Sequence, residues 1–211
     1  MARIDDYRAA VELGRKALRE TNPKRIADLC GASFEPNSDG DAVLGLEFLA
    51  RKITITWPKL IISFPSGDAL SLQEQVLILH YLKGAKGASA TGQWIAYQEV
   101  PDGKFYLDAF VRRAKNPMVQ VFGDQPELLV KLATQRYGAG SLDQGDFSVR
   151  IQALPLIPVA LIIWRGDDEF PPEGTILFDR NVSEILSAED IAWLAGMIVY
   201  PLIGMARGVS F

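Results

Sequence analysis

A run of three carboxylates stands in the segment WRGDDEFPPEG, residues 164–174, and consists of Asp167, Asp168 and Glu169. Carboxylate oxygens are the ligands that Mg²⁺ and Ca²⁺ prefer. Neighbouring carboxyl groups can also divide acid and base roles when their environments separate their pKa values. Asp179, a short way downstream, would complete such a group of acids. The segment is therefore the first place in the chain where we look for chemistry.

A structural interpretation of the same segment competes with the chemical one. Neighbouring residues on an extended chain point to opposite sides, and the spaced ligands of an EF-hand loop are absent. We expect a turn after a buried strand, in which Asp167 or Asp168 accepts hydrogen bonds from backbone N–H groups. Glu169 should point away from its neighbour, and Phe170 should be buried against the double proline that follows. A metal or acid–base site and a partner-binding surface stay open as alternatives.

The segment FVRRAKNP holds the densest basic cluster, with Arg112, Arg113 and Lys115. Two arginines at a helix end can bind a carboxylate or a phosphate in a bidentate manner. Arginines that are solvated or paired within the protein are the expected alternative. Because no aromatic residues are interleaved with these charges, and the chain has a net charge of −4, we expect no nucleic-acid partner.

The only histidine, His80, lies among apolar residues, and we expect it to be a hydrogen-bonded residue of the core or its boundary. A single imidazole also suffices as axial ligand of a haem or corrinoid metal, which is the alternative role. The only cysteine, Cys30, excludes a disulfide within the chain and is expected in the core. We assign no catalytic residue, no metal ligand and no cofactor. The candidate ligand-binding residues are Trp164, Asp167, Asp168, Glu169, Asp179, Arg112, Arg113 and His80.

The length of 211 residues predicts a single domain over residues 1–211, or at most two closely packed halves. A composition of 48% hydrophobic and 23% charged residues is typical of a globular protein with a sizeable core. The charged N-terminus has no apolar signal region, so we expect a cytoplasmic protein. The apolar segment at residues 191–206 is shorter than the roughly 20 residues that span a bilayer, and Pro201 interrupts it. We therefore expect a buried helix there and no membrane contact. The segment KGAKGASATG, residues 83–92, lacks the P-loop spacing and is expected to be a flexible surface loop.

Hydrophobic periodicity predicts two helices at the start of the chain, the second at residues 23–30 with Gly31 at its end. Strands are expected at residues 43–49, 52–57 and 60–64 as an antiparallel meander. A capping box formed by Ser71 and Glu74 then begins a central helix that runs to residue 82.

The second half of the chain predicts helices at residues 104–114 and 126–137, with Phe105 directed inward and a break or kink at Asn116-Pro117. A strand is expected at residues 146–151. The nearly continuous apolar run at residues 154–164 predicts a central strand buried on both faces, with residues 175–179 as its neighbour. The last helix begins at a second capping box, Ser187 to Asp190. We expect a mixed, largely antiparallel sheet flanked by helices, which is an α+β fold.

Three segments carry a resemblance to a known family: residues 153–194, SLQEQVLILHYL at residues 71–82, and FGDQPELL at residues 122–129. Over residues 5–200 the chain resembles the prokaryotic family known as domain of unknown function 3786. The resemblance implies no established activity and no catalytic residues. Some members of that family, which is known chiefly from anaerobes, are fused to a cysteine-rich iron–sulfur domain, which implies a link to corrinoid or one-carbon metabolism. With one cysteine, this chain is not expected to hold such a cluster.

The leading functional expectation is a cytoplasmic accessory or small-ligand-binding protein, whose ligand is a tetrapyrrole-like cofactor or another small molecule. One alternative is an enzyme with a divalent metal held by Asp167, Asp168, Glu169 and Asp179. The other is a structural interaction module, for which a homodimer is the simplest form.

Overall fold

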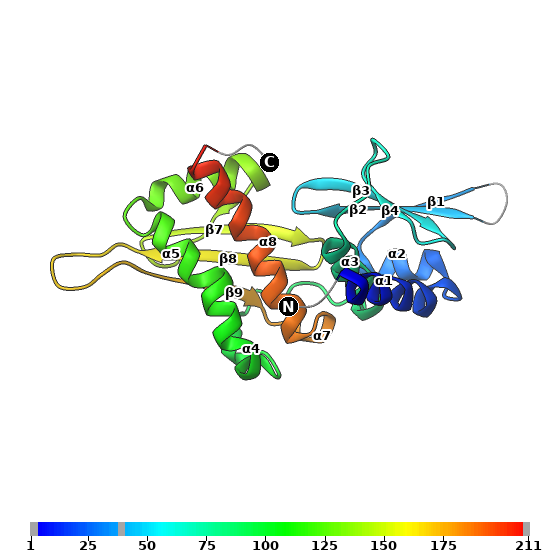
Figure 1. Ribbon diagram of the computed structural model, residues 1–211, viewed down its shortest axis with the longest axis horizontal. Coiled ribbons are helices and arrows are strands. Elements are labelled where there is room, and N and C mark those ends of the chain that lie inside the picture. Colours follow the sequence, from blue (N-terminus) through cyan, green and yellow to red (C-terminus); the bar gives the residue numbers. More distant parts are fainter. Residues whose placement is uncertain (1–3, 38–40, 209–211) are drawn as a thin grey trace. The chain divides into compact units, whose positions relative to one another are not determined.

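The computed structural model describes residues 4–37 and 41–208, which form two compact units (Figure 1). The first unit comprises Met1–Ser89 with two later insertions, Leu154–Leu156 and Glu184–Leu186. The second comprises Ala90–Ala153, Ile157–Ser183 and Ser187–Phe211. The α+β class predicted from the sequence is confirmed, and its strands form two antiparallel sheets, one in each unit. Whether the units fold as one domain stays a prediction.

Two helices begin the first unit, α1 (Ile4–Arg19) and α2 (Pro23–Cys30). Asn22 caps α2 by accepting a hydrogen bond from the backbone N–H of Arg25 at 3.1 Å, and Pro23 occupies the first helical turn. Gly31 ends the helix in the left-handed region, with φ 73°. Both ends lie where the sequence predicted them, because caps are determined by neighbouring residues.

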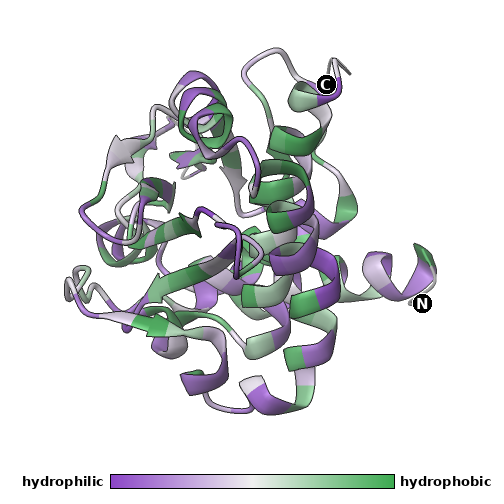
Figure 2. Cartoon of the chain, turned by 90° about the vertical axis from the view of Figure 1, so that its left-hand side faces the viewer, coloured by the Kyte–Doolittle hydropathy of each residue, from purple (hydrophilic) through white to green (hydrophobic). Residues whose placement is uncertain are grey.

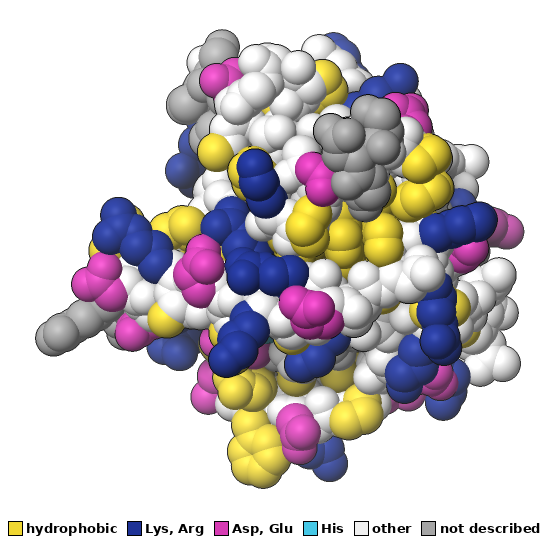
Figure 3. Space-filling view, turned by 90° about the vertical axis from the view of Figure 1, so that its right-hand side faces the viewer, with side chains coloured by type: hydrophobic (Ala, Val, Ile, Leu, Met, Phe, Trp, Pro, Cys, Tyr) yellow, Lys and Arg dark blue, Asp and Glu magenta, His cyan; other side chains and the backbone are white. Residues whose placement is uncertain are grey.

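The first sheet is an antiparallel meander of β1 (Ser33–Pro36), β2 (Ala42–Phe48), β3 (Arg51–Trp57) and β4 (Ile62–Ser63). Its two long strands alternate between buried and more exposed residues, which is the pattern of a sheet with one face on the core. The predicted meander is confirmed. On the face of the molecule shown in Figure 3, lysine and arginine side chains alternate with acidic ones, and hydrophobic side chains gather between them.

The core helix of this unit is α3 (Leu72–Gly84), which begins at the predicted capping box of Ser71 and Glu74. Tyr81 is buried in this helix, and its hydroxyl donates to the carbonyl of Cys30 at 2.6 Å and accepts from the N–H of Leu156 at 3.2 Å. Burial raises the pKa of Tyr81 above its ordinary value and the pKa of Cys30 to about 11. Cys30 is a core residue, as predicted.

The second sheet has the order β5 (Trp94–Ala96), β9 (Glu173–Asp179), β8 (Ile157–Trp164), β7 (Phe147–Leu154) and β6 (Gly140–Ser141). Strand β8 is central, and every residue in it except Trp164 is buried. This confirms the central strand predicted from the apolar run. The turn between β7 and β8 takes up the first residues of that run.

One long helical segment of the second unit consists of α4 (Gly103–Phe110), a π-helical stretch η2 (Val111–Lys115) and α5 (Asn116–Phe122). Of the break or kink predicted at Asn116-Pro117, the break is wrong and the kink stays a prediction. The helix continues through η2, where the N–H of Asn116 donates to the carbonyl of Val111. Proline lacks an N–H, and its ring clashes with the carbonyl four residues earlier in a regular α-helix. The wider π turn accommodates it. Phe105 is 86% exposed, so the prediction that it points inward is also wrong.

The remaining helices are α6 (Pro126–Tyr137), α7 (Val182–Ile185) and α8 (Ala188–Ala206), together with the short 3-10 helix η1 (Tyr97–Glu99). The ring of Tyr97 stacks on that of Phe110 with centroids 4.2 Å apart, and its hydroxyl donates to the carbonyl of Ala188 at 2.7 Å. In Figure 2 the helices on the side facing the viewer carry both hydrophobic and hydrophilic residues, as expected of helices with one face on a core.

Helix α8 is long and apolar enough to cross a membrane by length and composition alone, as the single such helix in the described residues. Within its most apolar window 56% of the residues are buried. The hydroxyl of Tyr137 donates to the carbonyl of Ile198 at 2.9 Å, which ties α6 to this helix. The core helix of a globular protein has these same properties, so the length of α8 is weak evidence for a membrane.

Candidate functional site

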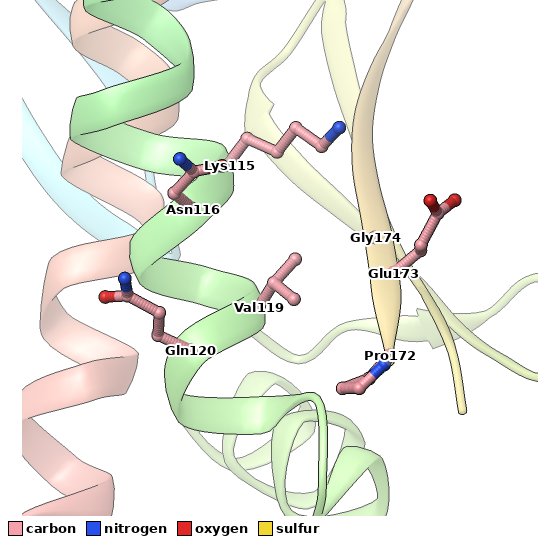
Figure 4. A pocket seen from close by; sticks show the side chains of 7 residues that line it. All are labelled: Lys115, Asn116, Val119, Gln120, Pro172, Glu173 and Gly174. Carbon is pink, nitrogen blue, oxygen red and sulfur yellow. The ribbon is translucent and has the colours of Figure 1, made fainter. Parts of the chain in front are cut away.

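A groove of about 200 Å³ lies between α5, with the end of η2, and the first residues of β9 (Figure 4). Its lining residues are Lys115, Asn116, Val119, Gln120, Pro172, Glu173 and Gly174. These residues belong to the two segments that the sequence analysis singled out, or to the helical turn that follows FVRRAKNP. The basic segment FVRRAKNP supplies the beginning of the helical side, and the acidic segment WRGDDEFPPEG supplies the strand side. The fold thus brings together two segments that no sequence pattern had linked.

The side chains around the groove point in different directions. In Figure 4 the Lys115 side chain extends toward β9, Val119 faces the strand, and the Pro172 ring faces the helix. The Glu173 carboxylate points away from α5. Strand register explains this, because Glu173 pairs with Trp164 and Gly174 pairs with Ile163, so that Glu173 and Gly174 lie on opposite faces of the sheet. The Lys115 ammonium group thus lies at one end of a groove into which Val119 and Pro172 point, and the Glu173 carboxylate is directed out of it.

Two glycines allow the helix to approach the strand. A Cβ atom on Gly174 would lie 2.9 Å from Val119 Cγ2 and 2.9 Å from the carbonyl oxygen of Ile162. A Cβ atom on Gly123, just after α5, would lie 2.8 Å from Pro172 Cγ. Real Cβ atoms are essentially never found so close to another heavy atom. Larger residues at these two positions would push α5 away from β9 and change the shape of the groove.

The acidic segment forms the predicted turn. One oxygen of Asp167 accepts hydrogen bonds from the N–H groups of Phe170 and Glu169, both at 2.8 Å, and these bonds hold the pKa of Asp167 below its usual value. Asp168 and Glu169 are exposed. Phe170 is 66% exposed, so its predicted burial is wrong. The reason is that the turn extends beyond the sheet (Figure 1), and Pro172, rather than Phe170, packs against the rest of the unit.

Asp179 has a structural role at the far end of β9. Its carboxylate is fully buried and accepts hydrogen bonds from the N–H and hydroxyl of Thr91 at 2.9 and 2.8 Å, from the N–H of Gly92 at 2.7 Å, and from the N–H of Asn181 at 3.1 Å. Burial opposes ionisation, but these hydrogen bonds prevail and lower the pKa of Asp179. The carboxylate therefore anchors the end of the Gly- and Ala-rich segment that was predicted to be a flexible loop.

The four acids of the hypothetical metal site do not come together. Asp179 ends β9, whereas Asp167, Asp168 and Glu169 precede its beginning, and six steps of about 3.3 Å along a strand separate the two ends by about 20 Å. No group of three or more histidine, cysteine or acidic residues that could hold a metal occurs in residues 4–37 and 41–208.

The other candidate residues lie outside the groove. Arg112 and Arg113 are exposed on η2, and the Nε of Arg112 donates to the carbonyl of Asp108 at 3.2 Å. Trp164 is 40% exposed and shares the face of Glu173. His80 is half-buried on α3 and belongs to the first unit, whereas the groove belongs to the second.

None of the eight residues proposed from the sequence as ligand-binding lines the groove, although several belong to the same two segments as its lining residues. Lys115 appeared in the basic cluster and was not chosen as a ligand-binding residue. Val119, Pro172 and Gly174 have no charged or reactive side chain that would mark them as part of a site. The sequence features that could have indicated the groove are a proline within a helical pattern and a glycine at the start of a strand.

Comparison with known proteins yields one match. No curated protein and no solved structure matches the chain. A family described as "Domain of unknown function (DUF3786)" matches residues 22–200. Because that match covers most of the chain, including both units and the groove, the protein belongs to this family.

Proposed function

We propose that the protein is an accessory protein that binds a small carboxylate in the groove between α5 and β9. The observation that carries the proposal is the half-buried Lys115, whose side chain extends across to β9 at one end of the groove, while Val119 and Pro172 line the groove further along. Its ammonium group has no ion-pair partner within 4.0 Å among the described residues. A ligand with a negative charge at one end and a short apolar part would match the charge and the apolar surface together.

The size of the groove narrows the choice of ligand. Pockets for drug-sized molecules have volumes of roughly 300–1,000 Å³, and this groove, at about 200 Å³, is smaller. A molecule with a few carbon atoms suits it better than a tetrapyrrole. The link to corrinoid or one-carbon metabolism then concerns the setting in which the protein works, not the occupant of the groove. The single buried thiol of Cys30 fits a reducing, cytoplasmic compartment.

Thermal unfolding with acetate, propionate or butyrate tests the proposal. A ligand with a dissociation constant of about 1 mM, present at about 10 mM, stabilises the folded state by about 1.4 kcal/mol. For a chain of this length that raises the melting temperature by about 3–5 °C. We expect this rise with butyrate and not with uncharged butyramide, because only the former pairs with Lys115.

Two variants separate the groove from general charge effects. Lys115→Met should abolish the response to butyrate. Arg113→Met removes the same charge from the same π-helical stretch but does not change the groove, so it should keep the response. Equal responses in wild type and Lys115→Met would place the ligand elsewhere and overturn the proposal.

A further inference from the structure

The turn between β8 and β9 presents an exposed aromatic residue from an ordered support. We call residues 165–172 the arm, and it extends away from the second sheet in Figure 1. The N–H of Asp167 donates to the carbonyl of Phe170 at 2.9 Å, and the carboxylate of Asp167 accepts two further backbone hydrogen bonds. These bonds hold the backbone of Phe170 in place, and 66% of the residue's surface is exposed. Binding through it would require little additional ordering.

Charges of the arm and of the groove are complementary and unused. The side chains of Asp168 and Glu169 on the arm make no ion pair among the described residues, and neither does that of Lys115 in the groove. Phe170 on the arm is apolar, as are Val119 and Pro172 in the lining of the groove. The arm thus carries what the groove is suited to bind, which is a carboxylate next to an apolar group.

We propose that the arm of a second copy of this chain binds in the groove, and that two copies exchange their arms about a twofold axis. The geometry of the hairpin permits this. Phe170 and Gly174 are four residues apart, or about 13 Å at about 3.3 Å per residue. Two arms that lie side by side in opposite directions therefore place each Phe170 at the base of the other arm, where the groove is. Such an exchange is closed and uses the same two surfaces on both copies.

The interface formed by two arms is small, and it lies below the roughly 1,200 Å² of a stable complex. We expect weak self-association, which sedimentation velocity detects between about 20 µM and 1 mM protein and which about 0.5 M NaCl weakens by screening the charges. In the dimer, the arm of each copy occupies the groove of the other. About 50 mM butyrate, which competes for the groove, should therefore dissociate the dimer. Wild type that stays monomeric up to 1 mM would overturn the inference.

A charge exchange between two variants gives the sharpest test. The arm variant Asp168→Lys/Glu169→Lys and the groove variant Lys115→Glu each bring like charges together in their own homodimers. Each should lose self-association by at least about tenfold. An equimolar mixture restores both pairs, with a basic arm against an acidic groove and the reverse, and should dimerise like wild type. A mixture that stays monomeric, or single variants that still dimerise, would refute arm exchange.

A matched pair of variants tests what the aromatic side chain of Phe170 contributes to the dimer. Phe170→Ser should weaken the dimer, whereas Phe105→Ser, which removes an even more exposed phenylalanine on α4, should leave it unchanged. Arm exchange rests on the groove of the proposed function, but different results would contradict arm exchange and the binding of small carboxylates. A protein that responds to butyrate yet never dimerises refutes arm exchange alone. A dimer that obeys the charge exchange in a protein that ignores butyrate refutes the binding of small carboxylates alone.

Discussion

Gly174 lies directly against Val119, and the missing Cβ atom of this glycine is what lets α5 rest on β9. In Gly174→Ala the new methyl group would meet both the Val119 side chain and the Ile162 carbonyl oxygen at 2.9 Å. We expect a loss of about 1–3 kcal/mol in the free energy of unfolding, measured by urea denaturation, and a loss of the response to butyrate. Gly140→Ala is the control, because a Cβ atom there meets nothing within 4 Å. Equal effects of the two changes would contradict this account.

The buried carboxylate of Asp179 should make stability depend on pH in the acid range. Its pKa is lower in the folded protein than in the unfolded chain, where an aspartate titrates near 3.9. The stabilisation is therefore present above about pH 4 and is lost as the pH falls through the lower, folded value. We expect Asp179→Asn to cost about 2–3 kcal/mol at pH 7, and the difference from wild type should shrink below pH 4.

The control for this experiment is Asp168→Asn, since Asp168 is exposed on the arm. Its unfolding free energy at pH 7 should equal that of wild type within about 0.5 kcal/mol. If Asp179→Asn instead lowered stability by a constant amount from pH 7 to pH 3, the ionised carboxylate would not be what holds Thr91 and Gly92.

Divalent metals should leave the melting temperature unchanged. The acids of the arm and Asp179 lie at opposite ends of β9, so they offer no common site. We expect the same melting temperature, within about 1 °C, in EDTA and in millimolar Mg²⁺ or Ca²⁺. A rise of several degrees that disappears in Asp168→Asn would restore the hypothesis of a metal enzyme, because a metal that binds only the folded state stabilises it by mass action.

Elements determined by neighbouring residues could be predicted from the sequence. The capping boxes at Ser71 and Ser187 and the helix end at Gly31 lie where the pattern placed them. Each depends on hydrogen bonds within a single turn, so no distant part of the chain affects it. The apolar run of β8 was equally clear, since a strand buried on both faces accepts apolar residues in succession.

Features that depend on distant packing could not be predicted. The π turn before Pro117 and the exposure of Phe170 are decided by how α5 and the β8–β9 hairpin pack, which local patterns do not encode. The groove belongs to the same class, because Lys115 and Gly174 meet only once the second sheet has formed. The division into two sheets also follows from which strands pair, and strand propensity alone is silent on pairing.

The first unit should not be stable when it is produced as residues 1–89 alone. Compact as it is, it includes Leu154–Leu156 and Glu184–Leu186 from later in the chain. The N–H of Leu156 donates to the buried hydroxyl of Tyr81, and Gly84 lies against the carbonyl of Ile185 so closely that a Cβ atom would not fit. The fragment lacks both segments and leaves part of α3 uncovered.

We therefore expect the fragment to show poor dispersion of its amide resonances and no cooperative urea transition. The whole chain should unfold cooperatively, and Tyr81→Phe in the whole chain should lower its unfolding free energy by about 1–2 kcal/mol through the loss of the hydrogen bond to the Cys30 carbonyl. A fragment that unfolds cooperatively, at the urea concentration that unfolds the same residues in the whole chain, would show that the first unit is an independent domain. In that case the two later segments would add nothing to its stability, and Tyr81→Phe should cost the same in the fragment as in the whole chain.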